Sequence, residues 1–136
     1  MIHLDTNVAI ALLNGDRPQV RARFDSARTA GTPFSLSIIG YHELMYGAAA
    51  SKRRKANEDK IALFIASGSI ALLPFEAADA SEAADIRAHL KRSGKPIGPY
   101  DVLIAAQARR AGTTLVTANT SEFARVPGLI VMDWAA

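Results

Sequence analysis

Short apolar runs alternate with longer helical patterns along the whole chain. The runs at 2–4, 33–37, 70–74, 114–117 and 129–132 have the length and composition of buried strands. The longer segments between them repeat apolar residues at helical spacing, and glycine, proline and asparagine mark the turns. This alternation predicts an α/β fold, in which a mainly parallel sheet of roughly five strands is covered by helices.

Six helical patterns of useful length can be bounded from these signals. They are expected after Asp5, from Pro18 to Ala30, after Ser37, from Lys52 to the stop at Gly68, from Asp79 to Ser93, and from Asp101 to Gly112. The segment at 101–106 is apolar on every side, which predicts a buried helix. A short helical turn is expected within 119–128. No linker, repeat or low-complexity stretch interrupts the pattern, so residues 1–136 are predicted to form a single domain.

Polar residues follow the predicted strand ends. Asp5 comes directly after the first strand, and Glu43 lies ~9 Å along the helix that starts near Ser37. Asp101 opens the buried helix, while Asn119 and Glu122 follow the fourth strand. Because parallel strands end at one edge of a sheet, these groups are expected to converge there. Oxygen ligands without thiolates or a histidine cluster favour Mg²⁺ or Mn²⁺ over Zn²⁺.

Each acid also has a simpler explanation when it is taken alone. Asp5 can be a helix N-cap, and Asp101 can be an acid favoured in the first turn by the helix dipole, an effect of ~0.3–1 kcal/mol. Glu43 shares a helix face with Gly40 and Gly47, and each glycine costs ~1 kcal/mol against alanine. Their presence indicates that something approaches this face closely, either a ligand or a packed backbone.

The histidines are expected to be structural. His3 falls in a strand and His89 on an amphipathic helix, while His42 is expected to face away from the neighbouring Glu43. The sequence contains no HExxH, GxSxG, GxGxxG or GxxxxGK[ST] pattern, which weighs against metalloprotease, esterase, dinucleotide-binding and NTPase functions.

Composition bears on the cellular location of the protein and on the partners it can bind. The chain has 136 residues, no cysteine, 49% hydrophobic residues and a net charge of +3. The missing cysteines exclude disulfides and favour a cytoplasmic location. No apolar run approaches the roughly 18 residues that cross a bilayer, and the start lacks the features of a secretory signal, so no membrane association is expected. The positive charge permits a nucleic-acid partner.

Together these segments resemble the PIN-domain ribonucleases, and among them the VapC toxins of bacterial toxin–antitoxin pairs. The segments that carry the resemblance are Leu4-Asp5-Thr6-Asn7, then residues 36–44 around Glu43, 97–106 around Asp101, 115–123 around Asn119, and 126–134. No single motif is specific, but their order and separations are. The resemblance implies a three-layer PIN-like sandwich.

The resemblance also implies a Mg²⁺- or Mn²⁺-dependent endoribonuclease with Asp5, Glu43 and Asp101 as metal ligands. Asn119 stands where many relatives have a fourth acid, so a second ion is expected to bind more weakly, and Glu122 is a candidate for the missing carboxylate. Four further residues are predicted to orient the ligands or the attacking water: Thr6, Asn7, Ser37 and Thr117. We predict in-line attack by a metal-activated water, leaving 5′-phosphate and 3′-hydroxyl ends.

The expected partners follow from the same resemblance. The substrate is RNA, with tRNA as the family's usual class. Candidate phosphate contacts are the run Lys52-Arg53-Arg54-Lys55, the pair Arg109-Arg110, and Lys91-Arg92 with Lys95. High apolar content and amphipathic helices suit a homodimer interface and a groove for a small antitoxin protein, whose C-terminal segment is expected to block the site.

Three other functions stay open from the sequence. The first is a PIN nuclease that processes RNA without an antitoxin. The second is a catalytically weakened PIN domain that only binds RNA, because Asn119 departs from the family pattern. The third is a receiver-like signalling domain, which is disfavoured because the first strand ends in a single acid and the third in Leu73-Pro74-Phe75.

Overall fold

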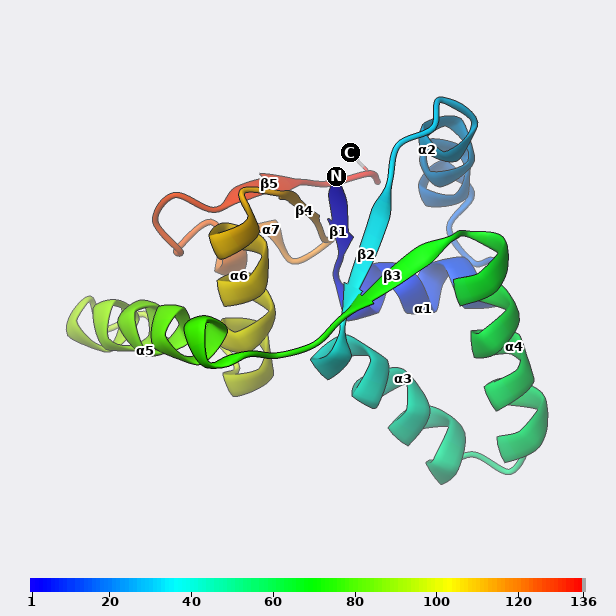
Figure 1. Ribbon diagram of the computed structural model, residues 1–136, viewed down its shortest axis with the longest axis horizontal. Coiled ribbons are helices and arrows are strands. Elements are labelled where there is room, and N and C mark those ends of the chain that lie inside the picture. The colour runs from blue at the N-terminus through cyan, green and yellow to red at the C-terminus, as the bar shows by residue number, and fades with distance from the viewer. Residues whose placement is uncertain (136) are drawn as a thin grey trace.

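The computed structural model describes residues 1–135 and has a parallel sheet at its centre (Figure 1). The strands are short: β1 (Ile2–Leu4), β2 (Phe34–Ser37), β3 (Ile70–Leu73), β4 (Thr114–Val116) and β5 (Ile130–Met132). Their order in the sheet is β3-β2-β1-β4-β5, and every neighbouring pair is parallel. The predicted α/β class and the five-stranded parallel sheet are confirmed.

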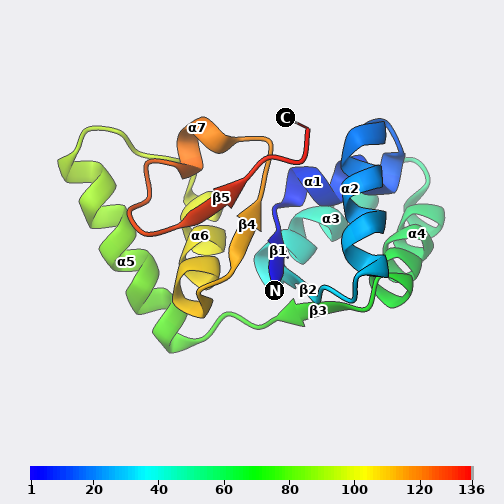
Figure 2. The same ribbon diagram turned by 90° about the horizontal axis from the view of Figure 1, so that it is seen from above.

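The helices separate into two groups, one on each face of the sheet (Figure 2). The first group is α1 (Thr6–Asn14), α2 (Pro18–Thr29), α3 (Ile38–Ala50) and α4 (Arg54–Ser67). The second group is α5 (Ala77–Arg92), α6 (Pro99–Ala111) and the short α7 (Thr120–Phe123). The sheet with these two helical layers forms the three-layer arrangement predicted for the chain.

Two apolar cores hold the layers together. The first core packs Phe24, Phe34 and Trp134 between the first helical group and the sheet, with the Phe24 and Phe34 rings stacked at 4.6 Å. The second core packs α5, α6 and α7 around the fully buried side chains of Leu115 and Phe123. Strand β4 contributes to both cores, because its alternating side chains place Val116 with Leu4 in the first core and Leu115 in the second.

The strand order reverses direction between β1 and β4. The chain steps outward from β1 to β2 and β3, and then crosses through α5 and α6 to β4 on the other side of β1. In parallel sheets such a reversal leaves a crevice at the carboxyl ends of the two strands, where ligands bind. Asp5 follows β1 and Thr117 follows β4, so both lie at this crevice.

No helix in residues 1–135 is long and apolar enough to span a membrane.

Candidate active site

Asp5 is the most constrained of the predicted site residues. Leu4 pairs with Val116 in the parallel ladder, which places the next residues, Asp5 and Thr117, beside each other. The Thr117 hydroxyl donates a hydrogen bond of 2.8 Å to Asp5 Oδ2, and the Thr6 backbone N–H donates one of 2.9 Å to Oδ1. Asp5 is only 2% exposed. Burial raises its pKa above the ordinary value, and nearby Glu43 raises it further, against the lowering effect of the two hydrogen bonds.

Thr6 connects Asp5 to Glu43. Asp5 is the N-cap of α1, and Thr6 is the first helical residue rather than the cap. The Thr6 hydroxyl instead donates a hydrogen bond of 2.7 Å to Glu43 Oε1. This bond requires α1 and α3 to approach closely, and Gly40 permits that approach. A Cβ atom at Gly40 would lie 3.1 Å from Thr6 Oγ1.

Asp101 faces the other acids from α6. Gly98 is the N-cap of this helix, Pro99 occupies its first turn, and Asp101 is the acid of that turn. Partial burial, followed by the negative charges of Asp5, Glu43 and Glu122, raises the pKa of Asp101 to about 6. These four acids are therefore near enough to repel one another. None of them forms an ion pair with another residue of the described chain.

Asn119 and Glu122 form a hydrogen-bonded pair after β4. The Asn119 side-chain amide donates a hydrogen bond of 3.0 Å to Glu122 Oε2, and the Asn119 backbone N–H donates one of 2.9 Å to the Thr117 hydroxyl. Thr117 thus links Asp5 to the segment that carries Glu122. The predicted contribution of Glu122 to metal binding has a geometric basis, and it stays a prediction.

The donor set fits a hard divalent cation by its chemistry. It consists of carboxylate oxygens with uncompensated negative charge, supported by hydroxyl and amide groups, as Mg²⁺ and Mn²⁺ prefer. Within residues 1–135, however, no three acids or histidines are already close enough to hold one ion together. To hold one cation together, the carboxylates would therefore have to draw inward, and the charge of the cation would offset their mutual repulsion.

Ser37 and Asn7 have different surroundings. The buried Ser37 caps α3, where its hydroxyl accepts a hydrogen bond of 3.0 Å from the Ile39 N–H. Asn7 is exposed and lines three cavities, one of which also contains Glu43. The structure thus gives Ser37 a helix-capping role and leaves Asn7 at the mouth of the crevice.

The basic residues lie at the periphery. Lys52 and Arg53 are exposed in the loop between α3 and α4, while Arg54 and Lys55 pair with acids one turn further along α4. Arg109 forms a half-buried ion pair of 2.7 Å with Glu82 and also donates to the Pro127 carbonyl. It therefore joins α6 to α5 and to the loop before β5, and its contact with RNA stays a prediction.

Sequence patterns missed several residues around the acids. A cavity of about 380 Å³ is lined by Glu43 together with His42, Tyr46 and Tyr100. His42 and Glu43 both line this cavity but contact different elements, because the His42 ring packs against Tyr100 of α6 whereas the Glu43 carboxylate accepts from Thr6 of α1. The available signal was position, since His42 precedes Glu43 and Tyr100 precedes Asp101 in the chain.

A second cavity, of about 400 Å³, lies against Asn7 and Asn119 and includes Arg17. Arg17 is exposed and makes no ion pair within residues 1–135. No sequence pattern singles out Arg17, because it stands in the turn before α2, far along the chain from the predicted site acids.

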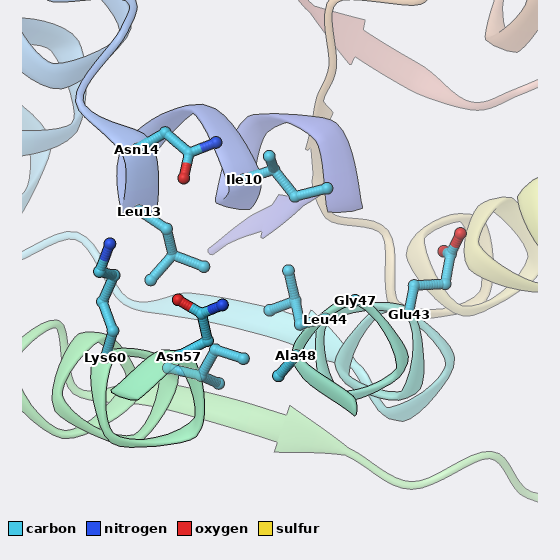
Figure 3. Close-up of a pocket in the computed structure, with 10 residues that line it drawn as sticks. Ile10, Leu13, Asn14, Glu43, Leu44, Gly47, Ala48, Asn57 and Lys60 are labelled. Atoms are coloured by element: carbon cyan, nitrogen blue, oxygen red, sulfur yellow. The ribbon is translucent and has the colours of Figure 1, made fainter. Parts of the chain in front are cut away.

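An apolar groove also leads away from Glu43. It measures about 250 Å³ and lies between α1, α3 and α4. Figure 3 shows Leu13, Leu44 and Ala48 along the groove, with Glu43 at one end and Lys60 near the other.

Residues 2–129 match the PIN domain family. The chain belongs to that family. Within the PIN-domain proteins it is 39% identical over 132 residues to the tRNA(fMet)-specific endonuclease VapC of Shigella flexneri, covering 97% of this chain and 96% of the relative. It is 35% identical to the enzyme of the same description from Salmonella typhimurium, with 96% of each chain covered.

Solved structures of PIN-domain proteins agree with this placement. The VapBC2 complex of Rickettsia felis, bound to a promoter DNA fragment, superposes with a TM-score of 0.90 at 30% identity, covering 98% of this chain and 99% of that one. The DNA-bound VapBC of Salmonella typhimurium gives 0.88 at 34% identity, covering 98% and 97%. The chain is thus a VapC-type PIN-domain protein, as the sequence motifs indicated.

Proposed function

We propose that this protein is a Mg²⁺- or Mn²⁺-dependent endoribonuclease and the toxin of a toxin–antitoxin pair. The observation that carries the proposal is the group of four acids at the crevice between β1 and β4, none of which has an ion-pair partner within residues 1–135. Partial burial and then the charges of the other three acids raise the pKa of Asp101 to about 6. Relatives with full-length similarity are ribonucleases of the VapC group.

Each acid has a defined task in this proposal. Asp5, Glu43 and Asp101 hold the cation, and Glu122 adds a fourth carboxylate beside Asn119. Thr117 and Thr6 fix the Asp5 and Glu43 carboxylates through hydrogen bonds of 2.8 and 2.7 Å. When bound, the divalent ion supplies charge neutralisation at the scissile phosphate and lowers the pKa of an attacking water. The products are 5′-phosphate and 3′-hydroxyl ends.

The substrate proposal follows the named relatives. Two of them are tRNA(fMet)-specific endonucleases, so we propose structured RNA, and initiator tRNA first, as the substrate of this chain. Its net charge of +3 favours association with a polyanion despite the local acids.

The partner proposal rests on the apolar groove beside Glu43. Similar structures are complexes of VapC-type proteins with their antitoxins. We propose that an antitoxin segment occupies the groove of Leu13, Leu44 and Ala48, which ends at the site (Figure 3). A homodimer is the proposed assembly state.

Cleavage assays with purified, partner-free protein test the enzyme. Initiator tRNA and other structured RNAs are incubated with Mg²⁺, Mn²⁺ or EDTA, beside the Asp5→Asn and Asp101→Asn variants. We expect metal-dependent cleavage that EDTA abolishes and that each substitution lowers at least a hundredfold, because each removes a charged ligand. Asp85→Asn, at an exposed position of α5, is the matched control and should cleave like the wild type.

Two results would contradict the proposal. Cleavage that persists in EDTA would exclude the metal requirement, and cleavage that survives both substitutions would exclude the acid site. Sequencing the cut ends adds a third check, because a 2′,3′-cyclic phosphate would mean that the 2′-hydroxyl, rather than water, attacks.

A further inference from the structure

The cavity of Tyr46 and Tyr100 has no task in the proposed chemistry, although Glu43 and Thr6 form part of its wall. It measures about 380 Å³ and opens beside Glu43 and Thr6, so it is continuous with the acid site. Tyr46 comes from α3 and Tyr100 from the start of α6, one residue before Asp101. The two aromatic residues therefore flank the acids from different elements.

Both rings are unusually open to solvent. Tyr46 is 67% exposed and Tyr100 is 47% exposed, although aromatic side chains usually bury most of their surface. The ring of His42 packs edge-on against Tyr100, with the ring centroids 6.0 Å apart and the planes at 87°. This contact fixes the orientation of Tyr100 without covering it.

The charges around the two neighbouring cavities differ. Of the described residues that line the tyrosine cavity, none is a lysine or an arginine and one, Glu43, is an acid, whereas the cavity beyond Asn7 contains both Arg17 and Asp16. A phosphate group therefore does not suit the first cavity, whose wall carries a carboxylate and no cation. An uncharged planar group with a π-face suits the first, because aromatic rings stack on every nucleobase.

We propose that the tyrosine cavity holds one unpaired base of the RNA, next to the cleaved bond, stacked on Tyr46 and Tyr100. The volume lies at the lower end of the range of ligand sites, which fits a single base rather than a length of strand. A base inside a duplex is stacked on its neighbours and cannot enter, so the site selects RNA that is single-stranded or looped at the cut. This inference rests on the proposed ribonuclease function.

A fluorescent base tests the contact without requiring cleavage. 2-Aminopurine is placed at each unpaired position of initiator tRNA in turn, and binding is measured with Ca²⁺ in place of Mg²⁺. We expect quenching at one or two adjacent positions in the wild type. Tyr46→Ala and Tyr100→Ala should abolish the quenching and weaken binding roughly tenfold to hundredfold, whereas Tyr46→Phe and Tyr100→Phe should keep both. Leu63→Ala is the control, because this exposed residue of α4 lies outside the cavity.

An abasic nucleotide at the quenched position completes the cycle. It should slow wild-type cleavage about as much as the tyrosine-to-alanine changes do, and it should add little further loss in those variants. The stacking would be overturned if the tyrosine-to-alanine changes slowed cleavage of the abasic RNA as much as cleavage of the intact RNA. Full activity of the alanine variants on intact RNA would also overturn it. A lower molecular mass of the alanine variants by light scattering would also overturn it, because the rings would then contact a second copy. A loss of antitoxin binding with unchanged RNA binding would do the same.

The outcomes separate the two proposals. Quenching without cleavage would leave the base site standing and refute the nuclease. Cleavage without quenching would do the reverse.

Discussion

The two oxygens of the Asp5 carboxylate have different partners. Oδ1 accepts from the Thr6 N–H as a helix cap, while Oδ2 accepts from the Thr117 hydroxyl across the sheet. From the sequence, cap and ligand were competing explanations for this residue. In the structure Asp5 both caps α1 and lies near another acid, because the charge of Glu43 adds to burial in raising the Asp5 pKa. The choice between explanations could not be made from local sequence, because Thr117 lies 112 residues away.

Asp101 gives a stability prediction for the metal-free protein. Its pKa is raised from 3.8 to about 6, so the folded chain binds this proton more tightly than the unfolded chain. Stability contributed by the protonated form is therefore present below pH 4 and lost as the pH rises through 6. Asp101→Asn removes the cost of burying the charged carboxylate and its repulsion by the other acids. Allowing for solvent screening and for the lost helix-dipole benefit, we expect a net gain of about 1 kcal/mol at pH 7.

Thermal unfolding in EDTA at pH 5 and pH 7.5 measures this effect. The melting temperature of Asp101→Asn should exceed that of the wild type by roughly 2–4 °C at pH 7.5, and the difference should shrink at pH 5. The exposed Asp85→Asn variant controls for loss of charge alone. If the difference in melting temperature between the wild type and Asp101→Asn is the same at pH 5 and pH 7.5, then ionised Asp101 does not destabilise the fold.

Replacing each of the two glycines of α3 by alanine should change the free energy of unfolding in opposite directions. A Cβ at Gly40 would lie 3.1 Å from both Thr6 Oγ1 and Leu36 Cδ1, whereas a Cβ at Gly47 would meet nothing within 4 Å. Gly47→Ala should raise the free energy of unfolding by roughly 0.5–1 kcal/mol through helix propensity. Gly40→Ala should lower it by about 1–3 kcal/mol by overpacking, and should lower cleavage by separating Thr6 from Glu43.

Urea denaturation and cleavage rates measure both variants side by side. A Gly40→Ala protein of full activity would contradict the account of the Thr6–Glu43 bond. The sequence had suggested a close approach at both glycines. That prediction is confirmed at Gly40 and wrong at Gly47 for contacts within the chain, because Gly47 borders the open groove between α1, α3 and α4.

Most elements could be bounded from the sequence because their caps are strong local signals. Ser37 caps α3, and Gly112 ends α6 in the left-handed conformation, with φ at 66°. The start of α5 was placed two residues late, at Asp79 instead of Ala77. Asp79 is already inside the first turn, where its carboxylate accepts from the Glu76 N–H at 2.9 Å. A glutamate is a weaker cap signal than serine or aspartate, so Asp79 attracted the assignment.

At the scale of the molecule, the meeting of the acids at one edge was predictable and their contacts were not. Alternating strands and helices imply parallel strands, whose carboxyl ends share an edge. The hydrogen bonds among Asp5, Thr6, Glu43 and Thr117 depend on the register of β1 with β4 and on how closely α1 approaches α3. The tyrosine cavity depends on the packing of α3 against α6, which no local pattern encodes.

The distribution of basic residues over the whole molecule leads to a salt-dependence prediction. Lys52 lies in the loop just beyond the end of α3 at Ala50, and Ala50 is seven positions or ~10 Å along the helix from Glu43, a span that RNA extending from the acid site can cover. Lys52 and Arg53 are exposed without ion-pair partners in the part of the chain that the structure describes, whereas Arg54 and Lys55 pair with Glu58 and Asp59. The first pair is therefore available for phosphates and the second is already partly neutralised.

RNA affinity measured between 50 and 300 mM KCl with Ca²⁺ present tests this difference. The double variant Lys52→Gln/Arg53→Gln should bind more weakly at low salt and reduce the slope of log affinity against log salt by roughly 0.7–0.9 for each lost phosphate contact. Arg54→Gln/Lys55→Gln removes the same charge and is the matched control. It should change the slope less, because its cations must first leave Glu58 and Asp59 to contact a phosphate. Equal changes in both double variants would mean that net charge alone, rather than this loop, attracts the RNA.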